Sequence, residues 1–159
     1  MKKKLLITLG IFLLIVFTSA VTYAVTSGAF NPKQSKPSDY KVGVSYDKAM
    51  NGNKPVLALF YVDWCGYCLR FMPKFKTIES LYKSDYNLLM INAEDVNHEA
   101  LVRDVRLTGY PTVYIIDPKY DNRVLLNNSV YGDLKAFRAE LDRYLKIRKL
   151  LDRAESCSK

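Results

Sequence analysis

Two cysteines separated by two residues, Cys65 and Cys68, lie between an apolar run and an amphipathic segment. Residues 56–62 are continuously apolar, as expected of a strand buried on both faces. After the cysteines, large apolar residues recur at helical spacing: Leu69, Met72, Phe75, Ile78 and Tyr82. The free N–H groups and the positive dipole end of a helix N-terminus stabilise a thiolate, so a pair at this junction is typical of redox chemistry.

Length and charge favour one globular domain and exclude some partners. The chain has 159 residues, 49% of them apolar, which suits a single core. The formal net charge is +8, and Lys2, Lys3 and Lys4 supply three of these charges. Basic residues near the C-terminus alternate with acidic ones, as on a solvated helix face. No cluster of aromatic and basic residues is present, so no nucleic-acid partner is expected.

Residues 1–25 are predicted to be a signal peptide or a transmembrane anchor. The three lysines precede an apolar stretch over residues 5–25, and about 20 residues are enough to span a bilayer as a helix. The small residues Ala20 and Ala24 also fit signal-peptidase sites, so both alternatives stay open. In either case we expect export to the extracytoplasmic side of a bacterial-type inner or plasma membrane. Residues 5–25 contact the membrane if they are retained.

The rest of the chain is predicted to comprise a flexible linker, one domain and a tail. Residues 26–39 are rich in Pro, Gly and small polar residues, 40–152 form the domain, and 153–159 form a C-terminal tail. Strands are expected at 41–44, 56–62, 88–91, 112–116 and 123–126, and helices at 45–50, 65–83, 98–106 and after Asp133. This alternation predicts an α/β fold with a mixed central sheet flanked by helices, ending in an antiparallel hairpin.

Three further features accompany the cysteine pair. Trp64 precedes Cys65, Pro73 lies inside the following helix, and the run 109–112 (Gly-Tyr-Pro-Thr) precedes a strand. Together these motifs resemble the thioredoxin superfamily over residues 40–151. The resemblance implies a thioredoxin fold and a thiol–disulfide oxidoreductase that acts on protein cysteines. It also implies no cofactor beyond the redox-active disulfide, no metal, and an upstream redox partner, located in the membrane if the leader is retained.

The resemblance assigns a role to each motif residue. Cys65 is expected to be the exposed nucleophile, and Cys68 the buried thiol that resolves the mixed disulfide. Pro111 is expected to be a cis-proline facing the cysteines, with the backbone of the preceding residue pairing with an extended client segment. The expected client-binding residues are Trp64, Gly66, Tyr67, Tyr110 and Pro111.

Two positions depart from the family pattern. Cytosolic thioredoxins carry a buried aspartate where Leu59 stands here, and a common lysine on the next strand is replaced by Leu89 or Met90. The usual proton relay to the resolving cysteine is therefore not expected. Asp63 is the nearest carboxylate in sequence, and the sequence leaves open whether it acts as a base or is a solvated turn residue.

The direction of electron flow and two other functions stay open. The Gly-Tyr dipeptide between the cysteines is similar to that of periplasmic disulfide isomerases. The layout of leader, linker and single domain instead resembles membrane-tethered reductases, so reduction is favoured over isomerisation or oxidation. The alternatives are a peptide-binding adaptor without turnover and a zinc site made by Cys65, Cys68, His98 and Cys157. Cys157 is otherwise expected to be a free thiol or to pair between chains.

Overall fold

The computed structural model describes residues 10–19, 22–23 and 35–157. The chain divides into two units, residues 1–34 and 35–159. In the first unit, residues 10–19 and 22–23 are helical. No helix within the described ranges combines the length and apolar character needed to cross a membrane. Much of the predicted leader and linker, namely residues 1–9, 20–21 and 24–34, lies outside the described residues.

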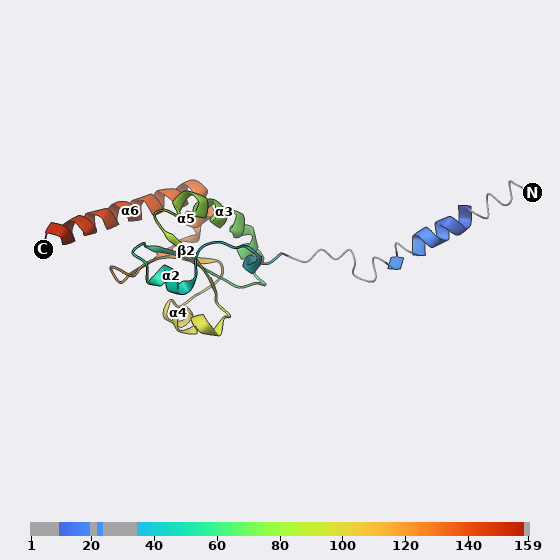
Figure 1. Cartoon of the computed structure of the whole chain (residues 1–159), viewed down its shortest axis with the longest axis horizontal. Helices are drawn as coiled ribbons and strands as arrows, with labels where there is room; N and C mark the ends of the chain where they lie inside the picture. Colours follow the sequence, from blue (N-terminus) through green and yellow to red (C-terminus); the bar gives the residue numbers. More distant parts are fainter. Residues whose placement is uncertain (1–9, 20–21, 24–34, 158–159) are drawn as a thin grey trace, which may run out of the picture. The chain divides into compact units, whose positions relative to one another are not determined.

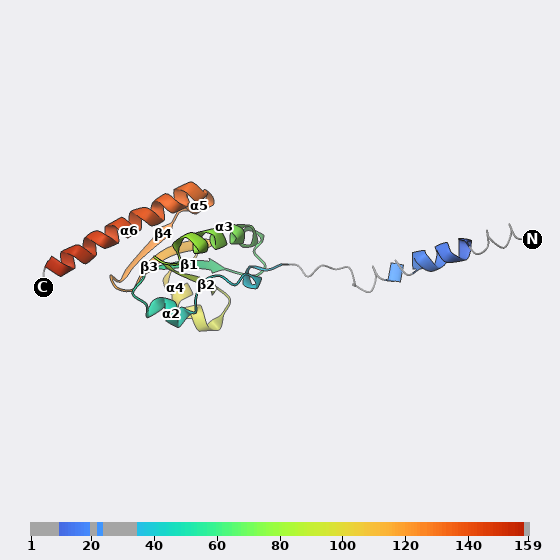
Figure 2. The same ribbon diagram turned by 45° about the horizontal axis from the view of Figure 1, so that its top comes forward.

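The second unit is built on a mixed β-sheet (Figures 1 and 2). Its strands are β1 (Val56–Tyr61), β2 (Asn87–Asn92), β3 (Thr112–Asp117) and β4 (Asn122–Leu126). Within the described part of the chain they lie in the order β2-β1-β3-β4. β1 pairs in parallel with β2 and antiparallel with β3, and β3 pairs antiparallel with β4. The prediction of a mixed sheet with a C-terminal hairpin is therefore confirmed.

Helices cover both faces of this sheet. They are η1 (Pro37–Asp39), α2 (Tyr46–Met50), α3 (Gly66–Tyr82), η2 (Val96–His98), α4 (Glu99–Asp104), α5 (Asn128–Gly132) and α6 (Leu134–Cys157). Figure 2 shows α3, α5 and α6 over one face and α2 and α4 over the other.

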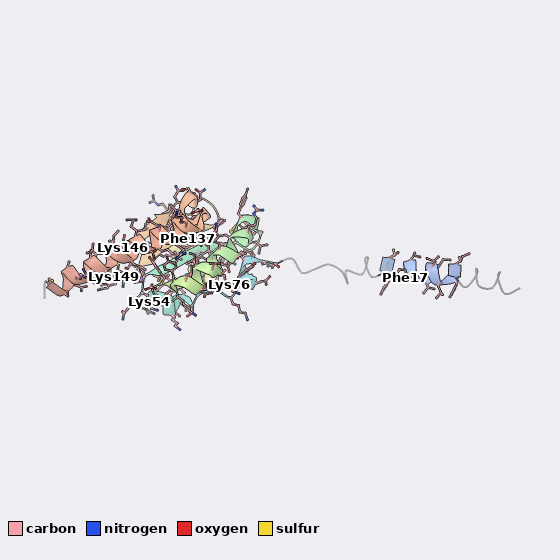
Figure 3. All side chains as sticks on the ribbon, turned by 90° about the horizontal axis from the view of Figure 1, so that it is seen from above. Phe17, Lys54, Lys76, Phe137, Lys146 and Lys149 are labelled. Carbon is pink, nitrogen blue, oxygen red and sulfur yellow. A yellow bond between two sulfur atoms is a disulfide. The ribbon has the colours of Figure 1, made fainter. Side chains whose placement is uncertain are left out.

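The domain has a hydrophobic core on each face of the sheet, and β1 contributes side chains to both. This explains why the sequence of β1 is apolar throughout. Successive side chains of a strand point to opposite faces. Leu57 and Leu59 pack with Phe137 of α6 (Figure 3) in one core, and Ala58 and Phe60 pack in the other. All six β1 residues are buried, so the burial of apolar area on both faces fixes this strand.

The strand expected over residues 41–44 does not form. Gly43 has a φ of +85°, and a Cβ at this position would lie 2.2 Å from the backbone oxygen of Leu88. Only a residue without a side chain fits this close approach. The backbone N–H of Val44 still donates to the Leu88 oxygen at 2.9 Å, so the segment follows the edge of β2 without becoming a strand.

The helices differ from expectation in two places. The helix expected over 98–106 is replaced by the shorter segments η2 and α4. α5 was not expected at all. Its N-cap is Asn127, whose side-chain oxygen accepts a hydrogen bond from the N–H of Ser129 at 2.9 Å. Such a short capped helix has too few residues to show an apolar periodicity.

The folded unit extends past both ends of the predicted domain. η1 falls within the range expected to be linker, and its Ser38 hydrogen-bonds to Asp63. α6 runs to Cys157, so residues 153–157 are helical and not a separate tail. At the other end of α6, Asp133 accepts a hydrogen bond from the N–H of Ala136 at 2.7 Å, as expected for an N-cap.

Candidate active site

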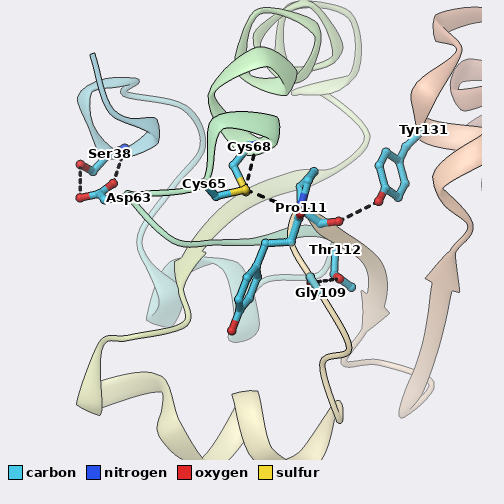
Figure 4. Close-up of a disulfide and its surroundings, with 9 residues drawn as sticks. Ser38, Asp63, Cys65, Cys68, Gly109, Pro111, Thr112 and Tyr131 are labelled. Atoms are coloured by element: carbon cyan, nitrogen blue, oxygen red, sulfur yellow. Dashed lines mark hydrogen bonds between the residues drawn. A yellow bond between two sulfur atoms is a disulfide. The ribbon is translucent and has the colours of Figure 1, made fainter. Parts of the chain in front are cut away.

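Cys65 and Cys68 form a disulfide at the N-terminus of α3 (Figure 4). Cys65 is the N-cap residue, with extended backbone, and its Sγ accepts a hydrogen bond from the N–H of Cys68 at 3.1 Å. The two α carbons lie 5.2 Å apart, within the ordinary range for a disulfide. After reduction, the same N–H and the helix dipole would stabilise a thiolate on Cys65.

The disulfide is more enclosed than the resemblance implied. Cys65 is only 6% exposed and Cys68 is fully buried. The reason is the packing of Cys65 among Tyr61, Val62 and Tyr110, with its Sγ 3.6 Å from the carbonyl oxygen of Tyr110. The small remaining exposure belongs to Cys65 and not to Cys68.

The loop opposite the disulfide contains a cis Tyr110–Pro111 peptide bond, as expected. Two hydrogen bonds hold this loop (Figure 4). The hydroxyl of Thr112 donates to the carbonyl of Gly109 at 2.7 Å. The hydroxyl of Tyr131, from α5, donates to the carbonyl of Pro111 at 2.7 Å. The sequence analysis missed Tyr131, because no motif marks the segment that carries it.

Trp64 lies on the surface next to the disulfide. It is 72% exposed, yet its indole N–H donates to the carboxylate of Glu94 at 2.9 Å. Its ring also meets the ring of Tyr110 edge to face, with centroids 6.3 Å apart. These contacts orient an otherwise mobile aromatic side chain beside Cys65. Glu94 was also missed, although it lies only two residues after the end of β2.

Apolar side chains occupy the positions of the usual proton relay. Leu59 and Met90 are direct partners in the β1–β2 register. Met90 packs against the cluster that contains Cys68, whereas Leu89 belongs to the core on the opposite face. Of the two candidates for the lysine position, Met90 is therefore the one that lies on the same side of the sheet as Cys68.

Asp63 is engaged in a structural contact. Its carboxylate accepts hydrogen bonds from the backbone N–H and the hydroxyl of Ser38, at 3.1 and 2.8 Å (Figure 4). Ser38 lies in η1, so this pair ties the start of the folded unit to the loop before Cys65. The geometry explains Asp63 as an anchor for η1.

A groove of about 660 Å³ borders the cis-proline loop. One wall is α3, and the other is formed by the loop, the end of β4 and α5. Of the predicted client-binding residues, Tyr67, Tyr110 and Pro111 line this groove, and Trp64 and Gly66 do not. Tyr67 is 71% exposed, so it presents an aromatic surface at the entrance nearest the disulfide.

The residues of the alternative zinc site are not brought together. Among the described residues, no group of three or more His, Cys, Asp or Glu side chains is placed to hold a metal ion. Cys157 is an exposed free thiol at the end of α6. The ring of His98 instead contacts Tyr46 of α2, with centroids 5.5 Å apart.

Comparison with known proteins identifies the family. The family model named Thioredoxin matches residues 39–137, and the chain belongs to this family. A protein disulfide-isomerase of Aspergillus oryzae is 32% identical over 108 residues, which cover 66% of this chain and 20% of that protein. The chloroplastic thioredoxin-like protein HCF164 of Arabidopsis thaliana is 31% identical over 72 residues, which cover 45% of this chain and 28% of that protein. This chain therefore spans less than a third of the length of either relative.

A solved structure supports the fold. The Trx4 domain of ERdj5 superposes with a TM-score of 0.54 at 17% identity, over 67% of this chain and 96% of that domain. The described residues 35–157 thus form a thioredoxin fold.

Proposed function

We propose that the chain is a thiol–disulfide oxidoreductase that exchanges disulfides with protein cysteines through Cys65 and Cys68. The observation that carries this proposal is the disulfide at the start of α3, opposite the loop of cis Pro111, with Cys65 as its more exposed residue. Client contact is assigned to the surface around it, formed by Trp64, Gly66, Tyr67, Tyr110 and Pro111.

In the reducing direction the reaction has two steps. The Cys65 thiolate attacks one sulfur of a client disulfide, which forms a mixed disulfide and releases one client thiolate. The Cys68 thiolate then attacks the Cys65 sulfur, closes the Cys65–Cys68 disulfide and releases the second client thiolate. Two electrons pass from the protein dithiol to the client, whose two thiolates take up the protons. An upstream dithiol reductant restores the reduced pair.

Reduction is the direction we favour, because a leader and linker ahead of a thioredoxin-like domain resemble the arrangement in membrane-tethered reductases. The Gly-Tyr dipeptide and the likeness to proteins named disulfide isomerases favour isomerisation as the second candidate. Equilibration of the Cys65–Cys68 pair with a glutathione buffer separates the two. A strongly reducing potential supports the reductase, and a strongly oxidising potential contradicts it.

The proposal includes export. The lysines and apolar stretch of residues 1–25 support a leader that carries the domain across a membrane and either stays as an anchor or is cleaved. We assign the upstream redox partner to that membrane. Fractionation of cells that express the full chain, followed by N-terminal sequencing of the protein, tests export and cleavage together. Recovery of the uncut protein in the cytosol would contradict it.

Three single variants test the chemistry. Cys65→Ser is expected to abolish disulfide reduction, because the thiol proposed to attack the client is lost and the remaining Cys68 is fully buried. Cys68→Ser is expected to accumulate mixed disulfides with client proteins, because the second step is blocked. Cys157→Ser is the matched control and should retain activity, since this thiol lies at the far end of α6. Turnover by the Cys65 variant would contradict the role of Cys65 as the attacking thiol. An empty trap together with no measurable turnover by the unaltered chain would instead favour a peptide-binding adaptor.

A further inference from the structure

The groove beside the cis-proline loop has a positively charged wall. Arg70 and Lys74 both line it, and their spacing of four residues places them on the same face of α3. No Asp or Glu is among its lining residues. Neither cation forms an ion pair with a carboxylate of the described residues. The wall therefore carries two positive charges that no carboxylate of the described residues neutralises.

Neighbouring groups orient these two charges without neutralising them. The Arg70 guanidinium carbon lies 4.5 Å from the centroid of the Tyr67 ring. The Lys74 ammonium donates to the carbonyl of Gly132 on the opposite wall and lies 6.0 Å from the ring centroid of Phe71. Arginine has five N–H donors and lysine three, so both side chains keep donors for a ligand.

The opposite wall is neutral and partly apolar. Leu125 is 58% exposed there, and Tyr131 closes the groove beneath the Pro111 carbonyl that it binds. Asn127 and Asn128 add amide groups at the end of β4. This combination suits an extended peptide whose acidic side chains face α3 and whose apolar side chains face β4.

We propose that this groove selects clients that carry Asp or Glu close to the reacting cysteine. The inference rests on the proposed oxidoreductase function and adds a substrate class to it. Along the axis of α3, Arg70 lies about 7.5 Å and Lys74 about 13.5 Å beyond Cys65. These distances correspond to roughly two and four residues of extended chain. Acidic side chains two and four residues from the client cysteine are therefore the expected partners.

Two peptides that differ only in charge test the inference. Each contains one disulfide, and positions two and four on both sides of each cysteine carry Glu in one peptide and Lys in the other. The full-length chain is expected to reduce the Glu peptide with about tenfold higher kcat/KM at low salt. The ratio should fall to about twofold at 0.5 M salt, because screening weakens pairs at the surface.

Charge reversal locates the effect. The double variant Arg70→Glu/Lys74→Glu is expected to prefer the Lys peptide. The matched control is Lys76→Glu, an exposed position on the same helix that does not line the groove (Figure 3), and it should keep the preference for the Glu peptide. The ratio of two peptides on one enzyme cancels any general loss of activity in a variant.

The outcomes separate this inference from the function on which it rests. Equal kcat/KM for both peptides with the unaltered chain overturns the groove assignment and leaves the oxidoreductase intact. A preference that survives in the double variant overturns it too, because Arg70 and Lys74 would then not be its source. A preference that disappears equally in the Lys76 control also overturns it, because net charge and not the groove would then be responsible. Reduction of neither peptide by the unaltered chain overturns the oxidoreductase function itself.

Discussion

Leu59 of β1 lies directly beside Met90 of β2 in the parallel register, where family members usually place an acid and a lysine. Met90 also packs against the cluster that contains the buried Cys68. The resolving thiol is therefore backed by apolar side chains and has no ionisable residue at either position. We infer that this protein releases mixed disulfides without help from these two positions, which makes its second chemical step slow.

The variant Leu59→Asp tests this explanation. A carboxylate at this fully buried position is expected to cost about 3 kcal/mol of stability. It should also speed the decay of the mixed disulfide about tenfold, because it provides a base near Cys68. The matched control is Leu59→Asn, because the Asn side chain has the same size as Asp but accepts no proton. It should lose stability without speeding the decay of the mixed disulfide. Stopped-flow kinetics with a client peptide measure the decay, and equal rates for the two variants would contradict the explanation.

The hydrogen bond from Tyr131 to the carbonyl of Pro111 predicts a link between α5 and client binding. Tyr131→Phe removes about 1 kcal/mol of stability and loosens the cis-proline loop. We expect KM for a client peptide to rise about fivefold, since the loop then has to be ordered on binding. Steady-state kinetics provide the measurement.

Tyr114 offers the matched control for this variant. It lies on β3, the strand that begins directly after Pro111, and its hydroxyl donates to the carbonyl of Val105 at 3.0 Å, but it does not line the groove. Tyr114→Phe should lose a similar amount of stability and keep KM unchanged. A parallel rise of KM in both variants would show that the effect is general softening of the fold.

Asp117 and Arg148 form a partly buried ion pair that joins β3 to α6. The Arg148 Nε lies 2.7 Å from a carboxylate oxygen of Asp117, which is fully buried. Arg148→Met is expected to cost about 3–5 kcal/mol, because it leaves a buried carboxylate without its cation. Urea unfolding measures the loss. The control Arg143→Met breaks only an exposed pair with Glu140 and should cost less than about 1 kcal/mol. Similar losses in both variants would contradict the special role of the partly buried pair.

Local patterns predicted the elements that position the disulfide. The apolar residues Val56 to Tyr61 identify a strand because they feed two cores, and the cysteines mark the start of the next helix. Asp133 was predicted as an N-cap because capping depends on a hydrogen bond three residues away. Each of these features depends on residues within a few positions of one another, so a single sequence is enough to predict it.

The remaining parts of the site depend on contacts between distant residues. Ser38 and Asp63 are 25 residues apart, and Tyr131 and Pro111 are 20 apart. The residues around each of these positions show no pattern that predicts its distant partner. Lys74 looks like an ordinary residue of a solvated helix face until the fold places α5 and the cis-proline loop opposite it. Binding surfaces made from separate segments are therefore the features that the sequence analysis missed.

Tyr86 predicts how stability changes in alkaline solution. Its side chain is almost fully buried, and its hydroxyl donates to the carbonyl of Leu141 at 2.8 Å. Burial, with smaller effects from nearby tyrosines and aspartates, raises the pKa of Tyr86 well above its usual value of 10.0. In the unfolded chain this hydroxyl ionises near pH 10, so above that pH the unfolded state binds fewer protons than the folded state. Stability should therefore be lost as pH rises beyond about 10, by up to about 1.4 kcal/mol per pH unit for this group.

The variant Tyr86→Phe isolates that contribution. Near pH 7 it should be about 1 kcal/mol less stable than the unaltered protein, because the hydrogen bond to Leu141 is lost. Its stability should fall less steeply above pH 10, so that the difference between the two proteins shrinks to about zero near pH 11. Urea unfolding at a series of pH values from 7 to 11 follows the two curves. Curves that stay parallel over this range would show that Tyr86 is not the group whose ionisation limits alkaline stability.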